Sequence, residues 1–446
     1  MPLPERPVPM PTRRSVLAGS VFCASLAILK LPPAAAATPH VLRAAPATVR
    51  LRGETQPATS LFAYEGTAPG PVLKARRGKA FAVRLENGLD RPTALHWHGV
   101  RLANTMDGVP GLTQPVVAPG AAFDYAFTPP DAGTFLYRPA VAAPGAAQGL
   151  AGVLVVEEDA SPNFDRDVVL ALSRWPLDAK GDLAPDGKPH LTANGAPTLD
   201  IPVRTNERLR LRLANVTGSD LMAVRIEQHE AFVVAIDGQP AETYPARNGR
   251  VVLGPGNRID LVLDARLAPG STAAVTVETR DTSALVATLV YEAGARPSAR
   301  DDVPRLPDNP LPQRIEFRGA QRLDLPLDPA ARLARKGAGG TPMWVALGEP
   351  TEVGPPLFNA KRGSVVMLAL ANKSGTPQSV HIPGHAVRLL DSLDDGWKPF
   401  WLDTILVLPN QTARVAFVAD NPGKWLISCR PLDAQAEPFA TWFAVG

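Results

Sequence analysis

The chain has 446 residues, a formal net charge of +3, 45% hydrophobic residues and 20% charged residues. This length is enough for about three domains of ordinary size, each with a core of its own. Lys and Arg are scattered among Asp and Glu without a long basic run, which argues against nucleic acid as a partner. The 48 prolines and 36 glycines favour many short strands joined by turns, because proline is excluded from helix interiors. The sequence therefore predicts a mostly β protein.

Residues 1–37 have the features of an export signal. Arg13 and Arg14 precede an apolar stretch that ends near Leu31, and the alanines after it suit cleavage near Ala37. Paired arginines at this spacing resemble the twin-arginine export signal, which implies a bacterial protein that folds before it reaches the periplasm. A Sec signal that happens to contain two arginines is the alternative. The apolar stretch is too short to span a bilayer, so no integral membrane segment is expected after cleavage.

Three β-rich units follow the signal. They are predicted at 40–158, 163–292 and 314–446, and a linker rich in proline and charge is predicted at 294–313. The first and third units contain similar stretches, each with Arg-Gly, an apolar strand, an Asn, a short loop and a strand carrying His. Internal similarity at this spacing indicates tandem domains, so the predicted architecture is three β-sandwiches in a row.

Alternating hydrophobicity supports this architecture. Phe81, Val83 and Leu85 fall on one face of a predicted strand, which is the pattern of a half-buried strand. In the second unit, the stretch NERLRLRLANVT places its leucines on one face and its arginines on the other.

The stretch LHWHGVRLANTMDGVPGLTQ suggests half of a copper site. His96 and His98 occupy alternate positions of a predicted strand, so their side chains point the same way. Asp107, in the DGVP turn of the same stretch, is interpreted as a turn and hydrogen-bond former. His40, His190, His229 and His385 have no paired spacing and are interpreted as surface or core residues.

The ordered motifs resemble those of the multicopper oxidase family. HWHG with DGVPGLTQ and GTFLY are similar to the first domain of that family, GPGNRIDLVLDA to its middle domain, and SVHIPGHAVRLL with GKWLISC to its last domain. The resemblance implies three tandem cupredoxin-like Greek-key domains. It also implies a type 1 copper held by one Cys and two His, and a trinuclear copper cluster held by eight His that reduces dioxygen. Such a set needs about ten histidines, and this chain has seven.

Most of the implied cluster ligands are replaced. The family's His-x-His after GTFLY is Arg138-Pro139-Ala140 here, and its His-Pro-x-His-x-His is Gln378-Ser379-Val380-His381-Ile382-Pro383. The resemblance therefore leaves three cluster histidines, which are His96, His98 and His381. By the family pattern, His96 and His381 correspond to the type 2 copper. An arginine cannot deprotonate to accept a copper ion, so Arg138 adds a fixed positive charge.

The implied type 1 site keeps only its cysteine. Removal of the signal takes Cys23 away and leaves Cys429 alone, so the mature chain cannot form an internal disulfide. The family's His-Cys-His is Ser428-Cys429-Arg430, and the positions five and ten residues after the cysteine are Ala434 and Phe439. A copper thiolate without an imidazole partner is a poor electron entry site. Whether Cys429 is buried or reactive is left open.

Three functional hypotheses follow. The first is a non-enzymatic periplasmic protein with a protein partner, no catalytic residue and no cofactor, similar to the copperless FtsP/SufI type that the resemblance links to cell division or envelope stress. The second is a copper-dependent oxidoreductase, either a laccase-like enzyme or a cuprous oxidase. The third is a mononuclear copper-binding protein that holds at most one copper with His96, His98 and His381, residues that could instead be merely packed and hydrogen-bonded.

Overall fold

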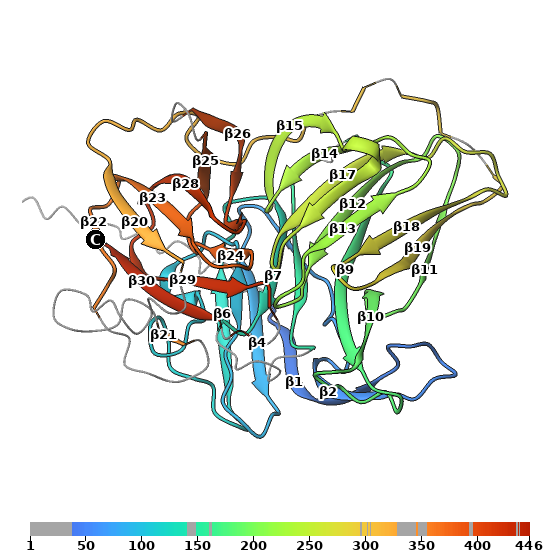
Figure 1. The fold of residues 1–446 in the computed structure, drawn as a ribbon, viewed down its shortest axis with the longest axis horizontal. Coiled ribbons are helices and arrows are strands. Elements are labelled where there is room, and N and C mark those ends of the chain that lie inside the picture. Colours follow the sequence, from blue (N-terminus) through green and yellow to red (C-terminus); the bar gives the residue numbers. More distant parts are fainter. Residues whose placement is uncertain are drawn as a thin grey trace, which may run out of the picture. The chain divides into compact units, whose positions relative to one another are not determined.

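The computed structural model describes residues 38–140, 149–159, 163–294, 297–300, 302–303, 305–327, 345–346, 355–391, 396–433, 436 and 438–446. The predicted signal segment, 1–37, lies outside these residues, and so does Ala434. The described chain is built from strands, with two short 3-10 helices, η1 (Asn104–Met106) and η2 (Arg247–Gly249) (Figure 1). The all-β prediction is confirmed. Within this described part, no helix is long and apolar enough to cross a membrane.

The first sandwich is formed by two four-stranded sheets. One sheet has the order β2 (Thr59–Tyr64), β1 (His40–Val49), β4 (Phe81–Asn87) and β6 (Ala122–Phe127). The other has the order β3 (Leu73–Arg76), β8 (Gly152–Glu157), β7 (Gly133–Arg138) and β5 (His96–His98). One hydrophobic cluster contains side chains of both sheets, among them Val83, Leu85 and Leu154. Phe81, Val83 and Leu85 are all buried, as their alternation predicted.

The second sandwich contains the strands from β9 to β19. One sheet has the order β10 (Lys188–Ala193), β9 (Arg166–Leu177), β12 (Arg208–Asn215), β17 (Arg258–Asp264), β14 (Ala231–Ile236) and β15 (Gln239–Pro245). The other has the order β11 (Leu199–Val203), β19 (Ser283–Tyr291), β18 (Thr272–Glu278), β13 (Met222–Ile226) and β16 (Arg250–Leu253). Leu211 of β12 and Val275 of β18 share one core between these sheets.

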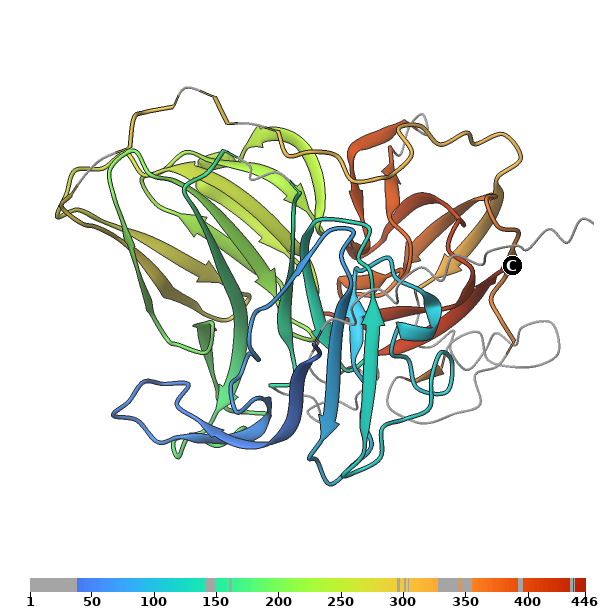
Figure 2. The ribbon, with the colours of Figure 1, turned by 180° about the vertical axis from the view of Figure 1, so that it is seen from behind.

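The third sandwich contains the strands from β20 to β30. One sheet has the order β20 (Gln321–Pro326), β23 (Val365–Asn372), β28 (Gln411–Val418), β25 (Val387–Leu390) and β26 (Trp397–Leu402). The other has the order β21 (Val345–Ala346), β30 (Phe439–Val445), β29 (Gly423–Pro431), β24 (Gln378–His381) and β27 (Thr404–Val407), and β22 (Asn359–Ala360) pairs with β30. Leu368 of β23 and Ile427 of β29 share its core. Figure 2 shows the three groups of strands from behind.

The burial of the arginines of β12 differs from what simple alternation predicts. Leu209, Leu211 and Leu213 are buried as expected, but Arg208, Arg210 and Arg212 on the opposite face are buried as well. Arg210 lies 2.6 Å from Asp260 of β17 and 2.6 Å from Glu158, which follows β8 of the first sandwich. Arg212 donates to Thr134 of β7 at 2.9 Å. The second face of β12 is therefore covered by the first sandwich, and carboxylates neutralise the charges that this packing buries.

The segment predicted as a linker also makes buried contacts. Asn309 donates to the carbonyl of Ala132 at 2.9 Å and accepts from its backbone N–H at 2.9 Å. The same amide donates to Gln239 of β15 at 2.8 Å. The described part of the segment is thus bonded to both the first and the second sandwich.

His385 lies in the aromatic core of the third sandwich. It is 2% exposed, and its ring centroid lies 5.0 Å from that of Phe417, 5.6 Å from that of Trp425 and 5.5 Å from that of Phe443. Burial lowers the pKa of His385 to about 4. Its Nδ1 donates to the Pro383 carbonyl at 3.1 Å, because a carbonyl oxygen can only accept.

The Arg210→Ala variant is expected to lose about 3–5 kcal/mol of unfolding free energy, because it leaves Asp260 and Glu158 as buried charges without this partner. Urea unfolding of the mature protein measures this loss in the transition that unfolds the second sandwich. The control is Arg225→Ala on the exposed face of β13, which is expected to change stability by less than about 0.5 kcal/mol. Equal midpoints for the two variants would contradict the assignment of Arg210 to a stabilising network.

The His385→Asn variant is expected to show a weaker loss of stability in acid than the wild type. The folded pKa of His385 is about 4 and the pKa of an unfolded histidine is about 6.5, so the unfolded chain binds the proton more tightly. In the wild type, neutral His385 makes its full contribution to the free energy of unfolding above pH 6.5. This contribution declines as the pH falls toward 4. The difference between the variants is expected to reach up to about 3 kcal/mol across this window. A series of urea titrations from pH 8 to pH 4 measures it, and parallel curves would show that His385 does not contribute.

Candidate metal centre

Three histidines that are far apart in the sequence meet in the interior. His96 and His98 come from β5 of the first sandwich, and His381 ends β24 of the third. All three are at most 5% exposed, and each offers a nitrogen within 4.8 Å of the others. The rings of His98 and His381 are stacked, with centroids 3.7 Å apart. The structure therefore brings together the three residues that the sequence singled out as a residual copper site.

His96 and His381 face each other through their Nε2 atoms, which lie 3.3 Å apart. The Nδ1 of His96 lies 2.8 Å from the Asp107 carbonyl, and the Nδ1 of His381 lies 3.2 Å from the Asp403 carbonyl. Because carbonyl oxygens only accept, both Nδ1 atoms donate, and a neutral ring then has its lone pair on Nε2. Two lone pairs that face each other repel unless a proton or a metal ion lies between them. This pair is the part of the site that fits a metal ion.

Both ring nitrogens of His98 have hydrogen-bond partners other than a metal ion. A guanidinium nitrogen of Arg138 lies 2.9 Å from its Nδ1, and Thr404 Oγ1 lies 2.8 Å from its Nε2. A guanidinium can only donate, so the lone pair of His98 is on Nδ1 and its proton is on Nε2. Thr404 Oγ1 accepts that proton and donates its own to Asp403 Oδ1 at 2.6 Å. In this arrangement neither nitrogen of His98 is available to a metal ion.

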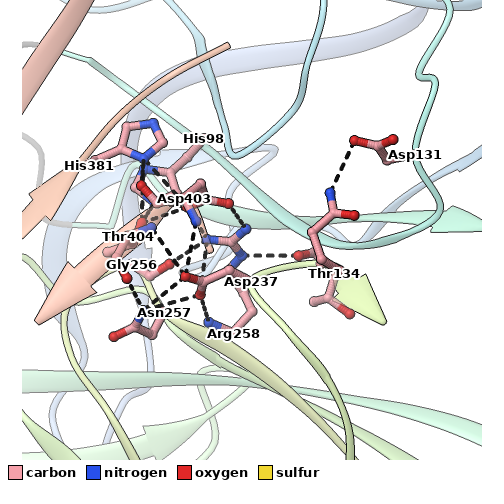
Figure 3. Close-up of polar contacts among 12 residues, drawn as sticks. His98, Asp131, Thr134, Asp237, Gly256, Asn257, Arg258, His381, Asp403 and Thr404 are labelled. Atoms are coloured by element: carbon pink, nitrogen blue, oxygen red, sulfur yellow. Dashed lines mark hydrogen bonds and ion pairs between the residues drawn. The ribbon is translucent and has the colours of Figure 1, made fainter. Parts of the chain in front are cut away.

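A buried ionic network surrounds His98 and His381 (Figure 3). Arg258 at the start of β17 donates to both carboxylate oxygens of Asp403, at 2.9 and 2.5 Å, and to the Thr134 carbonyl of β7 at 3.0 Å. Asp237 accepts from the Thr404 backbone N–H at 3.1 Å. These bonds fix the segment that supplies the partners of His98 and His381.

The charges of this network shift the pKa values of its carboxyl groups. Burial alone raises the pKa of Asp403, but the adjacent Arg258 guanidinium outweighs it and holds the pKa well below its usual range. Burial and the nearby charge of Asp403 raise the pKa of Asp237 to about 6. Burial also lowers the pKa of His381 to about 4. His381 is therefore neutral near pH 7, the state in which imidazole binds a metal ion.

Two glycines allow this close packing. A Cβ on Gly99, the glycine of HWHG, would lie 2.4 Å from a nitrogen of Arg258 and 2.4 Å from an oxygen of Asp403. A Cβ on Gly256, which has a φ of +84°, would lie 2.9 Å from the Nε2 of His98. The backbone before β17 thus packs directly on the histidine cluster, and the second sandwich contributes to a site made by all three.

Arg138 and Arg430 share a small cavity with the three histidines. The cavity has a volume of about 10 Å³, and its lining is His96, His98, Val109, Arg138, Ala140, His381, Leu426, Ser428 and Arg430. Burial, followed by the nearby charges of Arg430 and Arg258, lowers the pKa of Arg138 well below its usual value. The arginines that replace histidines in the motifs therefore project into the space around the remaining histidines.

Cys429 of β29 is fully buried. Its Sγ donates to Gln378 Oε1 at 3.3 Å, and it lies opposite Phe439 in the register of β29 and β30. Burial raises the pKa of the Cys429 thiol well above its usual value, although the charge of Arg430 acts in the opposite direction. The thiol is therefore protonated and not reactive near neutral pH. Gln378, which stands where the family motif has a histidine, lies beside the cysteine.

The sequence did not indicate several of these residues. Arg258 lies in the GPGNRID stretch and could have been suspected as a charge at the start of an apolar strand. Asp237, Asp403 and Thr404 belong to stretches with no motif that distinguishes them from turn residues. The other histidines lie apart from the site: His385 is in the core of the third sandwich, and His229 contacts Tyr291.

Comparison with known proteins covers nearly the whole described chain. Residues 46–161, 171–294 and 324–446 each match the multicopper oxidase family. The chain is 28% identical to the multicopper oxidase MmcO of Mycobacterium tuberculosis, over 92% of this chain and 88% of that protein.

Solved structures agree with this match. The structure of Lac15 from a marine microbial metagenome is 32% identical, with a TM-score of 0.78 over 92% of this chain and 100% of that chain. The multicopper oxidase of Pseudomonas thermotolerans is 31% identical, with a TM-score of 0.80 over 92% and 99%. These likenesses confirm the predicted fold of tandem cupredoxin-like domains. The chain belongs to the multicopper oxidase family.

Proposed function

We propose that this chain is a member of the family that no longer reduces dioxygen and that serves as a periplasmic protein-binding factor. The observation that carries the proposal is the hydrogen bond from the Arg138 guanidinium to the Nδ1 of His98, at 2.9 Å. In this arrangement a fixed cation occupies the lone pair that a copper ion would need. Although burial lowers the pKa of Arg138, an arginine side chain keeps N–H donors in either protonation state, so it can continue to donate to this lone pair near neutral pH.

The residues around the cluster position support the first part of the proposal. A trinuclear copper cluster needs about eight imidazoles by resemblance to the family, and the described cavity offers three. Arg138 and Arg430 add two positive charges to the same cavity. Additional copper cations beside these guanidiniums would be repelled in a medium that screens charge poorly. The residues present therefore do not fit the three-copper cluster.

The surroundings of Cys429 support it independently. A type 1 copper requires a thiolate and imidazole ligands. Here burial raises the pKa of the thiol, and its hydrogen goes to the amide oxygen of Gln378. Phe439 and Arg430 are the other neighbours that replace ligands by the family pattern, and neither offers a lone pair to a metal. An electron entry site does not fit these residues.

The second part of the proposal is the binding role. An export signal of the twin-arginine kind delivers folded proteins to the periplasm, and the loss of ligands leaves a folded three-sandwich scaffold whose surface is available to a partner. The resemblance to the FtsP/SufI type suggests that the partner belongs to the cell-division or envelope-stress machinery. The names of the relatives, multicopper oxidase and laccase, support the alternative, which is a copper-dependent oxidase of the laccase or cuprous oxidase kind. That alternative needs ligands that the motifs of this chain do not contain.

The mature protein, purified from cells grown with added copper, is expected to contain at most one copper per chain and to lack a strong blue absorption band. It is also expected not to consume oxygen with phenolic or cuprous substrates, because neither the type 1 site nor the cluster has its ligands. Elemental analysis, absorption spectroscopy and an oxygen electrode measure these three properties. A blue multicopper oxidase purified in parallel controls for copper loading.

The division phenotype of cells that lack the chain tests the binding role. Deletion is expected to impair division under envelope stress, and a His96→Ala/His381→Ala double variant is expected to restore division as well as the wild type does. Several coppers per chain with a blue band would overturn the first part of the proposal. A double variant that is present at normal levels but fails to restore division would overturn the metal-independent role.

A second candidate function is the binding of a single copper ion. The facing Nε2 atoms of His96 and His381, 3.3 Å apart, favour it because each Nδ1 proton is fixed by a carbonyl. Such a site would use these two histidines, with His98 held by Arg138.

Titration with Cu(I) in competition with a chelator is expected to show one site in the wild type and at least about a hundredfold weaker binding in His381→Ala, because one of two ligands is lost. The control is His190→Ala, at a histidine on β10 outside the cluster, which is expected to bind as the wild type does. Equal affinity of all three proteins would show that copper does not bind at this pair.

A further inference from the structure

A basic groove lies on the second sandwich, and none of its lining residues belongs to the cavity at the histidine cluster. Its larger part has a volume of about 800 Å³ and lies between residues 225–230 and 245–249. Its smaller part, of about 290 Å³, is lined by Arg225 of β13, Arg247 and Asn248 of η2, and Arg250 of β16. We call the two parts together the η2 groove. Three guanidiniums and one amide therefore line its smaller part.

The arginines of the η2 groove carry positive charge that the fold does not fully balance. Arg225 lies directly opposite Arg250 in the register of β13 and β16, and both side chains are exposed. Like charges in directly opposite positions destabilise a pair of strands. Arg250 has Glu278 at 3.6 Å, but among the described residues neither Arg225 nor Arg247 has an ion pair or a side-chain hydrogen bond. The stability of the sandwich therefore does not account for this cluster of arginines.

The backbone of η2 fixes the position of Arg247 against β13. Asn248 has a φ of +55° and Gly249 a φ of +64°, and the left-handed conformation favours these two residue types. A Cβ on Gly249 would lie 2.5 Å from the Ile226 carbonyl oxygen, so the turn packs directly on the end of β13. Because the turn and the sheet already order this part of the chain, little conformational entropy is lost there when a ligand binds.

The charges along the groove restrict what it can bind. A guanidinium binds a carboxylate through two parallel hydrogen bonds, so the part lined by three arginines fits adjacent acidic side chains. The larger part is also lined by Glu227 and Glu230, which are exposed. Both ring nitrogens of His229 are already bonded, to the Glu227 carbonyl and to the Tyr291 hydroxyl. The smaller part of the groove is therefore basic, whereas the larger part carries both charges.

We propose that the η2 groove docks a protein partner through a segment with adjacent acidic side chains at one end and a basic side chain at the other. The acidic side chains bind Arg225, Arg247 and Arg250, and the basic side chain lies beside Glu227 and Glu230. A bilayer of anionic lipids fits less well, because its uniform negative charge would meet the same two glutamates. This inference rests on the proposed protein-binding role and names the surface and the chemistry of that contact.

Fluorescence anisotropy with labelled synthetic peptides tests the groove on the mature wild-type protein. The probe peptide has three glutamates, a Gly-Ser-Gly spacer and two lysines, and the control peptide has the same residues with the charges alternating. The probe is expected to bind saturably and at least about tenfold more tightly than the control, because only the probe gathers its carboxylates at one end. Equal affinity of the two peptides, or binding to anionic lipid vesicles in place of the probe, would overturn the proposal.

Paired variants test the arginines themselves. Arg225→Gln/Arg247→Gln is expected to bind the probe at least about tenfold more weakly, because two charge-assisted donors are lost. The variant is expected to fold, since neither arginine has a described partner that would be left unpaired. The matched control is Arg204→Gln/Arg280→Gln, which removes two exposed arginines that follow β11 and β18 outside the groove, and which is expected to bind as the wild type does. Unchanged affinity in the groove variant would show that these arginines do not form the docking site.

Division assays separate this inference from the proposed function. In cells that lack the chain, the groove variant is expected to restore division under envelope stress less well than the control variant does. A groove variant that no longer binds the probe but restores division fully would refute the docking surface and leave the protein-binding role intact. Normal division without the chain would contradict the proposed function, and the peptide affinities would still decide what the groove binds.

Discussion

One arginine of the second sandwich connects all three domains at the histidine cluster. Arg258 donates to the carboxylate of Asp403 from the third sandwich and to the carbonyl of Thr134 from the first. Its charge keeps Asp403 ionised, and Asp403 in turn accepts the hydroxyl proton of Thr404. Toward His98, Thr404 Oγ1 can then act only as an acceptor. The ion pair thus favours the tautomer of His98 that has its proton on Nε2, and this tautomer leaves the Nδ1 lone pair to accept from Arg138.

The same network joins the domains through bonds between their own side chains and backbone. In the family, copper ions would bring positive charge and coordinate bonds to the junction of the domains. Here Arg258 and Asp403 join the domains through an ion pair, and Arg138 donates a hydrogen bond to His98. A buried ion pair with good geometry is costly to break once formed, because either partner alone would be a buried charge. The domain junction can therefore be maintained while the ligand positions change.

Sequence patterns predicted those features that depend on residue type and spacing alone. Phe81, Val83 and Leu85 alternate, and they are buried on one face of β4. The cluster of His96, His98 and His381 could be predicted from the sequence because the motifs that contain these residues are short and occur in a fixed order. The burial of the β12 arginines could not be predicted in this way. Alternation identifies the two faces of a strand, but it cannot show that a neighbouring domain covers the second face. The bond between Cys429 and Gln378 spans 51 residues and depends on the pairing of β24 with β29, which no local pattern encodes.

Overall identity and site chemistry give different kinds of information about this chain. An identity of about 30% over nearly the whole length reports mainly on the shared fold, because packing positions far outnumber the positions of a metal site. By the family resemblance, about ten positions would hold metals, so the replacement of several of them changes the identity very little. The chemistry of those positions is nevertheless decisive, because a guanidinium and an imidazole differ in whether they can offer a lone pair. The fold was therefore inherited with the family, whereas the function must be argued from Arg138, Gln378 and Arg430.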